Sequence, residues 1–247
     1  MNFAVSTLNR LVEKHGMVEY IRDYYAAING RLTMLYTRDD FYIAEDLTYQ
    51  PWLSVMGIIS DEISDKSLFD MLAGYVNDSK YIAVYTNIER VAKFLETFEI
   101  LTYHEDFLVG EITDVPAADG SDIRLATVSD LPFISSTYHR SGYEKLLNRV
   151  KAKQMWVLAH NEEIKGYAGI HKDGSLGYEY VSEKFRRQHV ATNLQCFVAN
   201  YMLKNGMIPY VMISKENSLG KNLQGKLKTN FAKNLFYFFA KGKYILE

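Results

Sequence analysis

Hydrophobic residues in the first half of the chain recur first at helical and then at strand-like spacing. Leu8, Leu11, Val12 and Val18 recur at spacings near three and four, which predicts a helix within residues 3–28. Shorter apolar runs separated by turn residues follow. They predict a hairpin of residues 32–36 and 41–44, a strand at 52–59, a helix at 67–76, a strand at 81–85, a helix at 89–98, and strands at 100–103 and 107–112.

The second half has a more regular pattern. It predicts strands at residues 123–126, 155–160, 164–171, 176–181, 208–213 and 231–240, and helices at 143–150, 190–204 and 219–227. A further helix is expected after Thr127-Val-Ser-Asp130, where Ser129 or Asp130 is a candidate cap and Pro132 lies in the first turn. Three strands joined by turns, followed by alternating helix and strand, predict an α+β fold with a mixed sheet covered by helices on both faces. Tyr81–Glu111 and Pro209–Ala240 share one element order, which suggests that the first half is a diverged relative of the second.

The net charge of the chain changes sign near the segment where the hydrophobic pattern is weakest. Residues 113–122 are small and polar and are interpreted as a linker. Residues 1–115 hold nine Lys and Arg against 19 Asp and Glu, a balance of −10, whereas the remainder has a balance of +8. We therefore expect one domain at 1–117 and a second at 118–247, with the basic second domain as the better place for an anionic ligand. Alternatively, the opposite charges simply help the two halves to dock.

Composition excludes several classes of protein. Apolar residues make up 48% of the 247, enough for a core, and no apolar run approaches the roughly 18 residues of a membrane span. The single cysteine, Cys196, excludes an intrachain disulfide framework and a cysteine-based zinc site, and the histidine spacing predicts no metal. The first residues lack the apolar segment of a signal peptide, so we expect the cytoplasm. The acidic first half argues against a nucleic-acid partner.

The chemistry is expected in residues 174–194. A strand ends at Val181, a basic loop follows, and a helix then begins. The first turn of a helix has unpaired backbone N–H groups and the positive end of the helix dipole, so it favours a bound phosphate. Arg186 and Arg187 add positive charge at this point.

These residues resemble the GNAT N-acetyltransferase superfamily. Arg186-Arg-Gln-His-Val-Ala191 is similar to the pyrophosphate loop Arg/Gln-x-x-Gly-x-Gly/Ala of that family. Asn217-Ser-Leu-Gly-Lys-Asn-Leu-Gln-Gly-Lys-Leu227 is similar to its Asn-x-x-Ser-x-x-Leu-x-x-Lys-Leu-Gly segment. The resemblance covers about residues 122–240 and is most similar to the glycine N-acyltransferase-like branch, in which a diverged half-domain precedes the catalytic one. His189 and Lys228 replace glycines of the family pattern.

The resemblance implies an acyl-CoA bound between the fourth and fifth strands of the family's sheet. The backbones of Tyr180 and Val181 would then contact the pantetheine and the thioester, and Asn217 would contact the pantetheine arm or the adenosine side. Seven consecutive residues would hold the pyrophosphate: Arg186, Arg187, Gln188, His189, Val190, Ala191 and Thr192.

The sequence offers several candidates for the proton-transfer groups. Ser175 stands where many members of the family have a basic Glu, so Glu179, four residues later and on the same face of a regular strand, is our candidate base. Alternatively, Glu179 satisfies a neighbouring arginine. His171 is a second candidate base, or a solvated turn residue. Gln224 stands where the family has an acidic Tyr, which leaves Tyr143, Tyr167 and Tyr178 as candidate acids.

We expect an enzyme that transfers an acetyl group from acetyl-CoA, or another acyl-CoA, to a primary amine by direct attack in a ternary complex. The acceptor would be a small molecule or a peptide; no metal or membrane is expected, and a homodimer is compatible with the sequence. A non-catalytic acyl-CoA sensor or interaction module is the alternative, and an aminoacyl transferase that uses charged transfer RNA is a third reading.

Overall fold

The computed structural model describes residues 3–60, 64–78 and 80–240, which form two compact units. The first unit comprises the described residues up to Val109 and residues 231–240, which belong to the last strand; the second is Gly110–Asn230. The sequence pattern placed this last strand with the second half of the chain. Its pairing with a strand of the first unit, through Tyr237 and Tyr85, places it with the first. A period-two pattern predicts a strand but does not identify the strand that pairs with it.

The first unit begins with helices α1 (Phe3–His15) and α2 (Ile21–Ile28). The single helix expected over residues 3–28 is therefore interrupted, at Gly16, where φ is +94°. The remaining elements are β1 (Leu32–Arg38), β2 (Phe41–Asp46), β3 (Trp52–Gly57), α3 (Asp65–Val76), β4 (Ala83–Thr86), α4 (Glu89–Leu95), β5 (Leu101–Glu111) and β11 (Asn230–Ala240). The predicted hairpin is confirmed as β1 and β2, whereas the two strands expected at 100–103 and 107–112 form the single strand β5.

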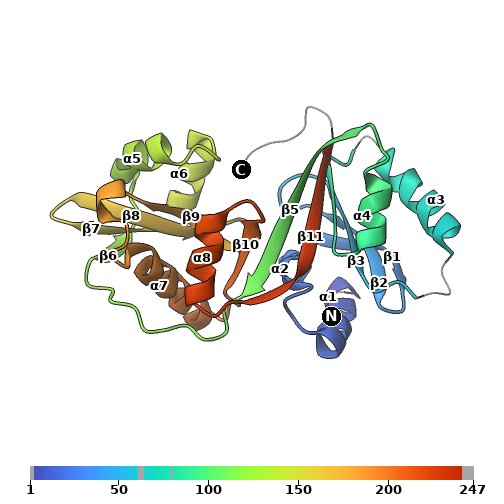
Figure 1. The fold of residues 1–247 in the computed structure, drawn as a ribbon, viewed down its shortest axis with the longest axis horizontal. Helices are drawn as coiled ribbons and strands as arrows, with labels where there is room; N and C mark the ends of the chain where they lie inside the picture. The colour runs from blue at the N-terminus through green and yellow to red at the C-terminus, as the bar shows by residue number, and fades with distance from the viewer. Residues whose placement is uncertain (1–2, 61–63, 79, 241–247) are drawn as a thin grey trace. The chain divides into compact units, whose positions relative to one another are not determined.

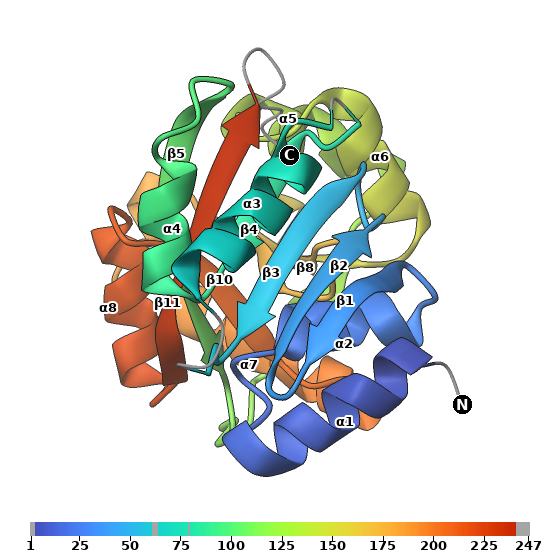
Figure 2. The ribbon, with the colours of Figure 1, turned by 90° about the vertical axis from the view of Figure 1, so that its right-hand side faces the viewer.

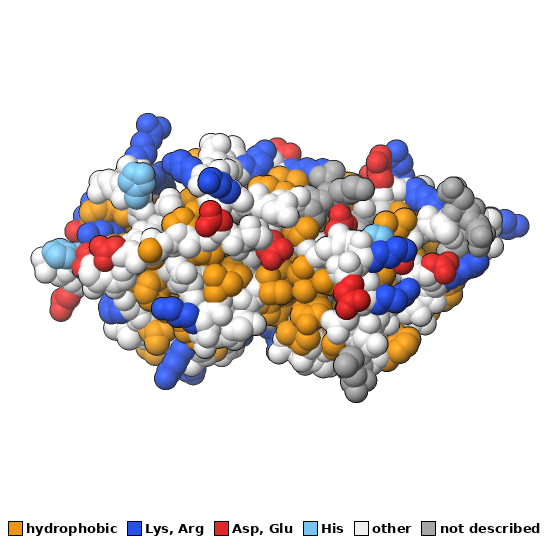
Figure 3. All heavy atoms as spheres, turned by 90° about the horizontal axis from the view of Figure 1, so that it is seen from below, with side chains coloured by type: hydrophobic (Ala, Val, Ile, Leu, Met, Phe, Trp, Pro, Cys, Tyr) orange, Lys and Arg blue, Asp and Glu red, His pale blue; other side chains and the backbone are white. Residues whose placement is uncertain are grey.

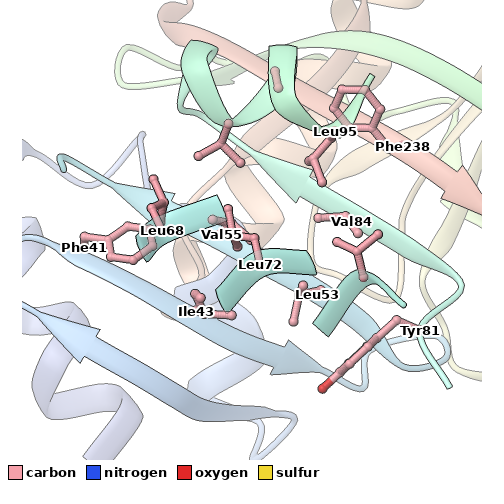
Figure 4. Close-up of a cluster of buried hydrophobic side chains, with 13 residues drawn as sticks. Phe41, Ile43, Leu53, Val55, Leu68, Leu72, Tyr81, Val84, Leu95 and Phe238 are labelled. Atoms are coloured by element: carbon pink, nitrogen blue, oxygen red, sulfur yellow. The ribbon is translucent and has the colours of Figure 1, made fainter. Parts of the chain in front are cut away.

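The sheet of the first unit is covered on both faces. Helices α3 and α4 pack on one face, where Leu68, Leu72 and Leu95 meet Val55 and other apolar residues of β2, β3, β4 and β11 (Figures 2 and 4). Helix α2 lies on the other face. There the carboxylate of Asp23 accepts hydrogen bonds from the hydroxyls of Tyr42, Ser54 and Tyr85, and burial raises the pKa of that carboxyl.

The second unit follows the predicted order of elements. They are β6 (Ile123–Leu125), α5 (Leu131–Thr137), α6 (Tyr143–Lys151), β7 (Met155–His160), β8 (Glu163–Ile170), β9 (Leu176–Val181), α7 (Val190–Lys204), β10 (Tyr210–Ser214) and α8 (Ser218–Lys226). The strands lie in the order β6-β7-β8-β9-β10. All neighbours are antiparallel except β9 and β10, which are parallel.

Two consecutive residues of β8 show how this sheet is covered. Tyr167 belongs to the cluster formed with α5 and α6, whereas a Cβ at Gly166 would lie 3.2 Å from Val190 and 3.3 Å from Leu194 of α7. Consecutive strand residues point to opposite faces, so α7 packs on the face opposite α5 and α6 (Figure 1). The missing side chain at Gly166 lets the first turns of α7 lie directly on β8.

The expected linker is an ordered strap along α7. The side chain of Asn193 accepts a hydrogen bond from the N–H of Asp119 at 2.9 Å and donates one to its carbonyl at 2.7 Å. Two turns further along the helix, Asn200 donates to the carbonyl of Pro116 at 2.9 Å. Side-chain amides that satisfy the backbone of this small, polar segment explain why it is held without a regular element of its own.

Candidate functional site

Strand β9 contains a β-bulge near its middle. Tyr167 of β8 is in register with Tyr180, and Gly169 with Gly177, so two steps along β8 correspond to three along β9. The extra residue coincides with Tyr178, whose φ of +51° lies in the left-handed region. A bulge of this kind bends its strand and disturbs the pairing on either side.

The pairing of β9 with β10 ends just before this bulge. The ladder contains one register pair, Leu176 with Val211. We refer to the region beyond this pair, between residues 177–181 of β9 and 212–214 of β10, as the β9–β10 fork. The N–H of Ser182 donates to Lys165 of β8 at 2.9 Å. Because backbone groups alternate along a strand, the N–H of Val181 points the other way, into the fork.

Eight residues separate the end of β9 from the start of helix α7, whose first backbone N–H groups have no partner within the helix. Its first internal hydrogen bond runs from the N–H of Asn193 to the carbonyl of His189, at 2.9 Å. The N–H groups of Val190, Ala191 and Thr192 therefore have no partner within the helix. His189 has φ +60° and ψ +10°, the left-handed conformation that a glycine adopts most easily, so the histidine reproduces the backbone expected at the family's glycine.

The polar side chains of this loop are exposed and only partly engaged. Arg186 donates through Nε to the carbonyl of Val181 at 3.3 Å and lies 3.4 Å from the carboxylate of Glu183. Gln188 is tied back to the carbonyl of Lys184 at 3.0 Å. On the face drawn in Figure 3, lysine and arginine side chains lie at several separate places rather than in one patch. The loop itself carries the charges of Glu183, Lys184, Arg186 and Arg187, and Arg186 already contacts the β9 end of the fork.

Glu179 lies at the bulge, and no cationic side chain of the described residues pairs with its carboxyl group. Its Oε1 is inaccessible to solvent and has no hydrogen-bond partner among the described residues. Burial alone raises the pKa of Glu179 to about 8. The alternative, that Glu179 satisfies a neighbouring arginine, is wrong for the described residues, since none of their cations pairs with it. The expectation that Glu179 shares a face with Ser175 assumed strict alternation, which the bulge interrupts.

Ser175 and His171 have structural contacts at the closed end of the fork. The Ser175 hydroxyl donates to the carboxylate of Asp173 at 2.6 Å and is buried. The ring of His171 lies against Gly177 and stacks on Tyr178, with centroids 4.0 Å apart. Burial lowers the pKa of His171, so the neutral ring is favoured. His171 is therefore a packed residue rather than a solvated turn histidine.

The candidate acids differ in their surroundings. The hydroxyl of Tyr167 lies 2.9 Å from that of Thr137, and burial raises the pKa of Tyr167 to about 12. Tyr178 is buried in the cluster with α5 and α6, and Tyr143 is about half exposed at the start of α6. Gln224 is buried and accepts a hydrogen bond from the hydroxyl of Thr229 at 2.6 Å. This hydrogen bond connects the last turn of α8 to the residues that follow the helix.

Asn217 caps helix α8. Its Oδ1 accepts the N–H of Gly220 at 2.9 Å, which fixes the first turn of that helix directly after β10. The first turn of α7 therefore follows strand β9, and Asn217 follows strand β10, so a helix start comes after each strand of the fork. Within residues 3–60, 64–78 and 80–240 no group of three potential metal-ligating side chains occurs, and no helix there has the length and hydropathy to cross a bilayer.

Comparison with known proteins identifies the fold. No protein-family model and no curated protein sequence matches the chain. A Drosophila protein solved by a structural genomics consortium is similar over 97% of both chains, with a TM-score of 0.69 and 11% identity. A GNAT-family acetyltransferase from Colwellia psychrerythraea gives a TM-score of 0.55 at 12% identity, over 96% of this chain and 97% of that one. A GCN5-related N-acetyltransferase from Kribbella flavida gives 0.54 at 10% identity, over 92% and 97%. The predicted mixed α/β sheet is thus confirmed, and the chain has the fold of GNAT-family acetyltransferases.

Proposed function

We propose that this protein is an acyl-CoA-dependent N-acyltransferase which, in its simplest form, transfers the acetyl group of acetyl-CoA to a primary amine. One observation carries the proposal: the bulged strand β9 loses its pairing to β10 and leads into a helix that begins with three unpaired N–H groups. The pyrophosphate of an acyl-CoA can accept hydrogen bonds from the backbone donors at the start of the helix. The amides of its pantetheine arm can pair with the free edge of β9.

We assign each part of the acyl-CoA to residues of β9, of the loop that follows it, and of the starts of α7 and α8. The pyrophosphate would accept hydrogen bonds from the N–H groups of residues 190–192, and the side chains of Arg186 and Arg187 would add charge–charge attraction. The pantetheine would lie along the edge of β9 at Tyr180 and Val181. Asn217, at the end of the other strand of the fork, would contact the pantetheine arm or the adenosine side.

The reaction would be a direct attack within the ternary complex. An alkyl amine is mostly protonated at neutral pH, so a base must first accept its proton. We assign this step to Glu179, whose carboxyl group has no partner among the described residues; an ammonium group bound beside it would favour the ionised carboxylate, which would then take one proton. The amine nitrogen then bonds to the thioester carbon, and the N–H of Val181 stabilises the negative oxygen. The C–S bond breaks and the thiolate of CoA leaves; of the two protons left on the nitrogen, one is lost to solvent or to the thiolate and the other stays on the amide.

Isothermal titration with CoA and acetyl-CoA tests the proposal without knowledge of the acceptor. We expect binding at micromolar to low millimolar ligand, and a loss of at least tenfold in affinity when Arg186 and Arg187 are both replaced by Glu. Arg38→Glu, an exposed arginine in the first unit, is the matched control and is expected to bind as the wild type does. The proposal is refuted if acetyl-CoA does not bind at millimolar concentration, or if the charge reversal leaves its affinity unchanged.

A non-catalytic acyl-CoA-binding protein is the second candidate. It is favoured by Gln224, which replaces the family's tyrosine and is engaged by Thr229. Release of CoA thiol, measured with a disulfide reagent over a panel of alkyl amines, amino acids and peptides, separates the two. Binding of acetyl-CoA without release of thiol on any acceptor supports the non-catalytic role. The glycine N-acyltransferase-like branch and the cytoplasmic location stay predictions from the sequence.

A further inference from the structure

Helix α7 buries the side chain of Gln195 completely. Neither the oxygen nor the nitrogen of its carboxamide has a hydrogen-bond partner among the described residues. Its buried neighbours on the helix, Leu194, Val198 and Ala199, are apolar. A buried donor and acceptor without partners destabilise a fold, and an apolar side chain of similar size avoids that loss. A ligand that supplies both hydrogen bonds explains why an amide stands at this position.

The contacts of its neighbours show in which direction Gln195 points. The side chain of Asn193 holds the strap of residues 116–119, which leads into the edge strand β6. Leu194 lies over Gly166 of β8, in the middle of the sheet. Each residue of an α-helix is turned by about 100° from the one before it, so Gln195 continues the rotation from the strap, past β8, to the far side. Because α7 also packs on β9, that far side faces β9 and the β9–β10 fork.

Gln195 also lies at the level of Glu179 along the strand. Helix α7 connects the parallel strands β9 and β10, so it runs antiparallel to both. The contact over Gly166 centres near residue 192 of α7, and Gly166 is in register with Val181. From Val181 back to Glu179 is about 7 Å along the strand, which the helix covers in about four residues. That step along α7 ends within about one residue of Gln195.

Glu179 points to the face of the sheet that α7 covers. Tyr178 belongs to the cluster formed with α5 and α6, and Tyr180 packs against that cluster. The residue between them therefore points to the opposite face. Oε1 of Glu179 is buried and, like the carboxamide of Gln195, has no partner among the described residues. Two buried polar groups thus border the fork on its α7 side, one from the strand and one from the helix.

We propose that Gln195 binds the pantetheine arm of the acyl-CoA: its nitrogen donates to an amide carbonyl of the arm, and its oxygen accepts from an amide N–H. This inference rests on the proposed function, which puts the arm along β9. The arm has two amides and so offers both groups, which a carboxamide complements. A phosphate would pair only with the nitrogen of Gln195, and an ammonium group only with its oxygen. The amides are therefore the part of an acyl-CoA that fits this side chain.

Titration with CoA and with 3′-phosphoadenosine 5′-diphosphate, which is CoA without its pantetheine, tests the inference. For Gln195→Leu we expect the affinity for CoA to fall at least fivefold and that for the truncated nucleotide to change less than twofold. Gln50→Leu, at an exposed glutamine of the first unit, is the matched control and should bind both ligands as the wild type does.

A loss for CoA that is no larger than the loss for the truncated nucleotide overturns the inference and leaves the proposed function standing. That result is also the one expected if Gln195 holds only a buried water. Failure of the wild type to bind CoA at all overturns both.

The stability of the unliganded protein gives a second measurement. Leucine keeps most of the volume and removes the unpaired amide, so we expect Gln195→Leu to raise the thermal midpoint without ligand, and saturating CoA to raise the midpoint of the wild type more than that of the variant. Gln195→Met keeps the length of glutamine and replaces the leucine variant in both measurements if that protein does not fold. A lower midpoint in both variants shows that the amide already has a partner within the protein, and overturns the inference.

Discussion

The carboxyl group of Glu179 gives the sharpest test of the site, because its effect on stability needs neither substrate nor acceptor. Burial raises the pKa of Glu179 from 4.5 to about 8. A carboxyl group with a higher pKa in the folded protein than in the unfolded chain holds its proton more tightly when folded. Stability is therefore greatest below pH 4.5 for this group and falls as the pH rises toward 8. Glu179→Gln keeps the shape of the side chain and removes the titration.

The magnitude follows from the two pKa values. Each pH unit between them costs about 1.4 kcal/mol, so the wild type loses about 3–4 kcal/mol relative to Glu179→Gln between pH 5 and pH 8. This is a large share of the stability of a typical domain. Taking the difference between the two proteins at each pH cancels every other titrating group that the substitution leaves unchanged.

The assay is urea unfolding of both proteins at intervals from pH 5 to pH 9. We expect the free energy of unfolding of Glu179→Gln to exceed that of the wild type by an amount that grows with pH and levels off above pH 8. Glu144→Gln, an exposed residue of α6, should differ from the wild type by a constant over the same range. A constant difference for Glu179→Gln would refute the argument that the carboxyl is buried without a counter-ion.

Three further substitutions test the elements that hold the site. Gly166→Ala places a Cβ 2.6 Å from the carbonyl of Tyr180 and 3.2 Å from α7, so we expect a loss of about 1–3 kcal/mol in urea unfolding; no loss would mean that α7 does not rest on β8. His189→Gly removes the cost of a left-handed side-chain residue, and the thermal midpoint should rise by the equivalent of about 1 kcal/mol; a fall would contradict the φ of +60°. Asp130→Asn weakens the carboxylate that accepts two bonds from Arg124 and the N–H of residue 127, a loss of about 1 kcal/mol at pH 7. These partners lower the pKa of Asp130, so its stabilisation is fully present well above pH 3.8 and is lost as the pH falls below 3.8 and through the lowered value; the difference in urea unfolding should be smaller at pH 3 than at pH 7.

The order of helices and strands could be predicted from the sequence because each element carries its own periodicity. Helix α7 shows this, since its apolar residues and the Asn205-Gly206 end are local signals, and the structure ends it at Lys204. The pairing of strands that lie far apart in the sequence could not be predicted. Strand β11 pairs with β4 of the first unit, and nothing in its own residues specifies that partner.

The bulge in β9 is the feature of the site that the sequence concealed. Tyr178 adopts a left-handed backbone without being glycine, asparagine or aspartate, so no residue type marks the position. The extra residue then undoes the parity that linked Glu179 to Ser175. By contrast, His189 belongs to a residue type that is enriched in the left-handed region, and its place in the loop pattern was a usable signal for the turn that begins α7.

The first unit shows what this one extra residue does. It contains the order strand, helix, strand as β4, α4 and β5, and the chain repeats this order later as β10 and α8 of the second unit followed by β11. Its parallel pair is closed, however: β3 stays in register with β2 without a bulge and pairs with β4 over four positions, from Trp52–Ala83 to Val55–Thr86. In addition, the side chain of Ser64 already accepts the N–H of Ser67 at the start of α3. Among the described residues of the first unit, β3 and β4 therefore leave no fork between them, and the side chain of Ser64 already pairs one N–H at the start of α3. A titration should therefore give one acyl-CoA per chain, and a stoichiometry of two would show that an unbulged strand pair can bind it as well.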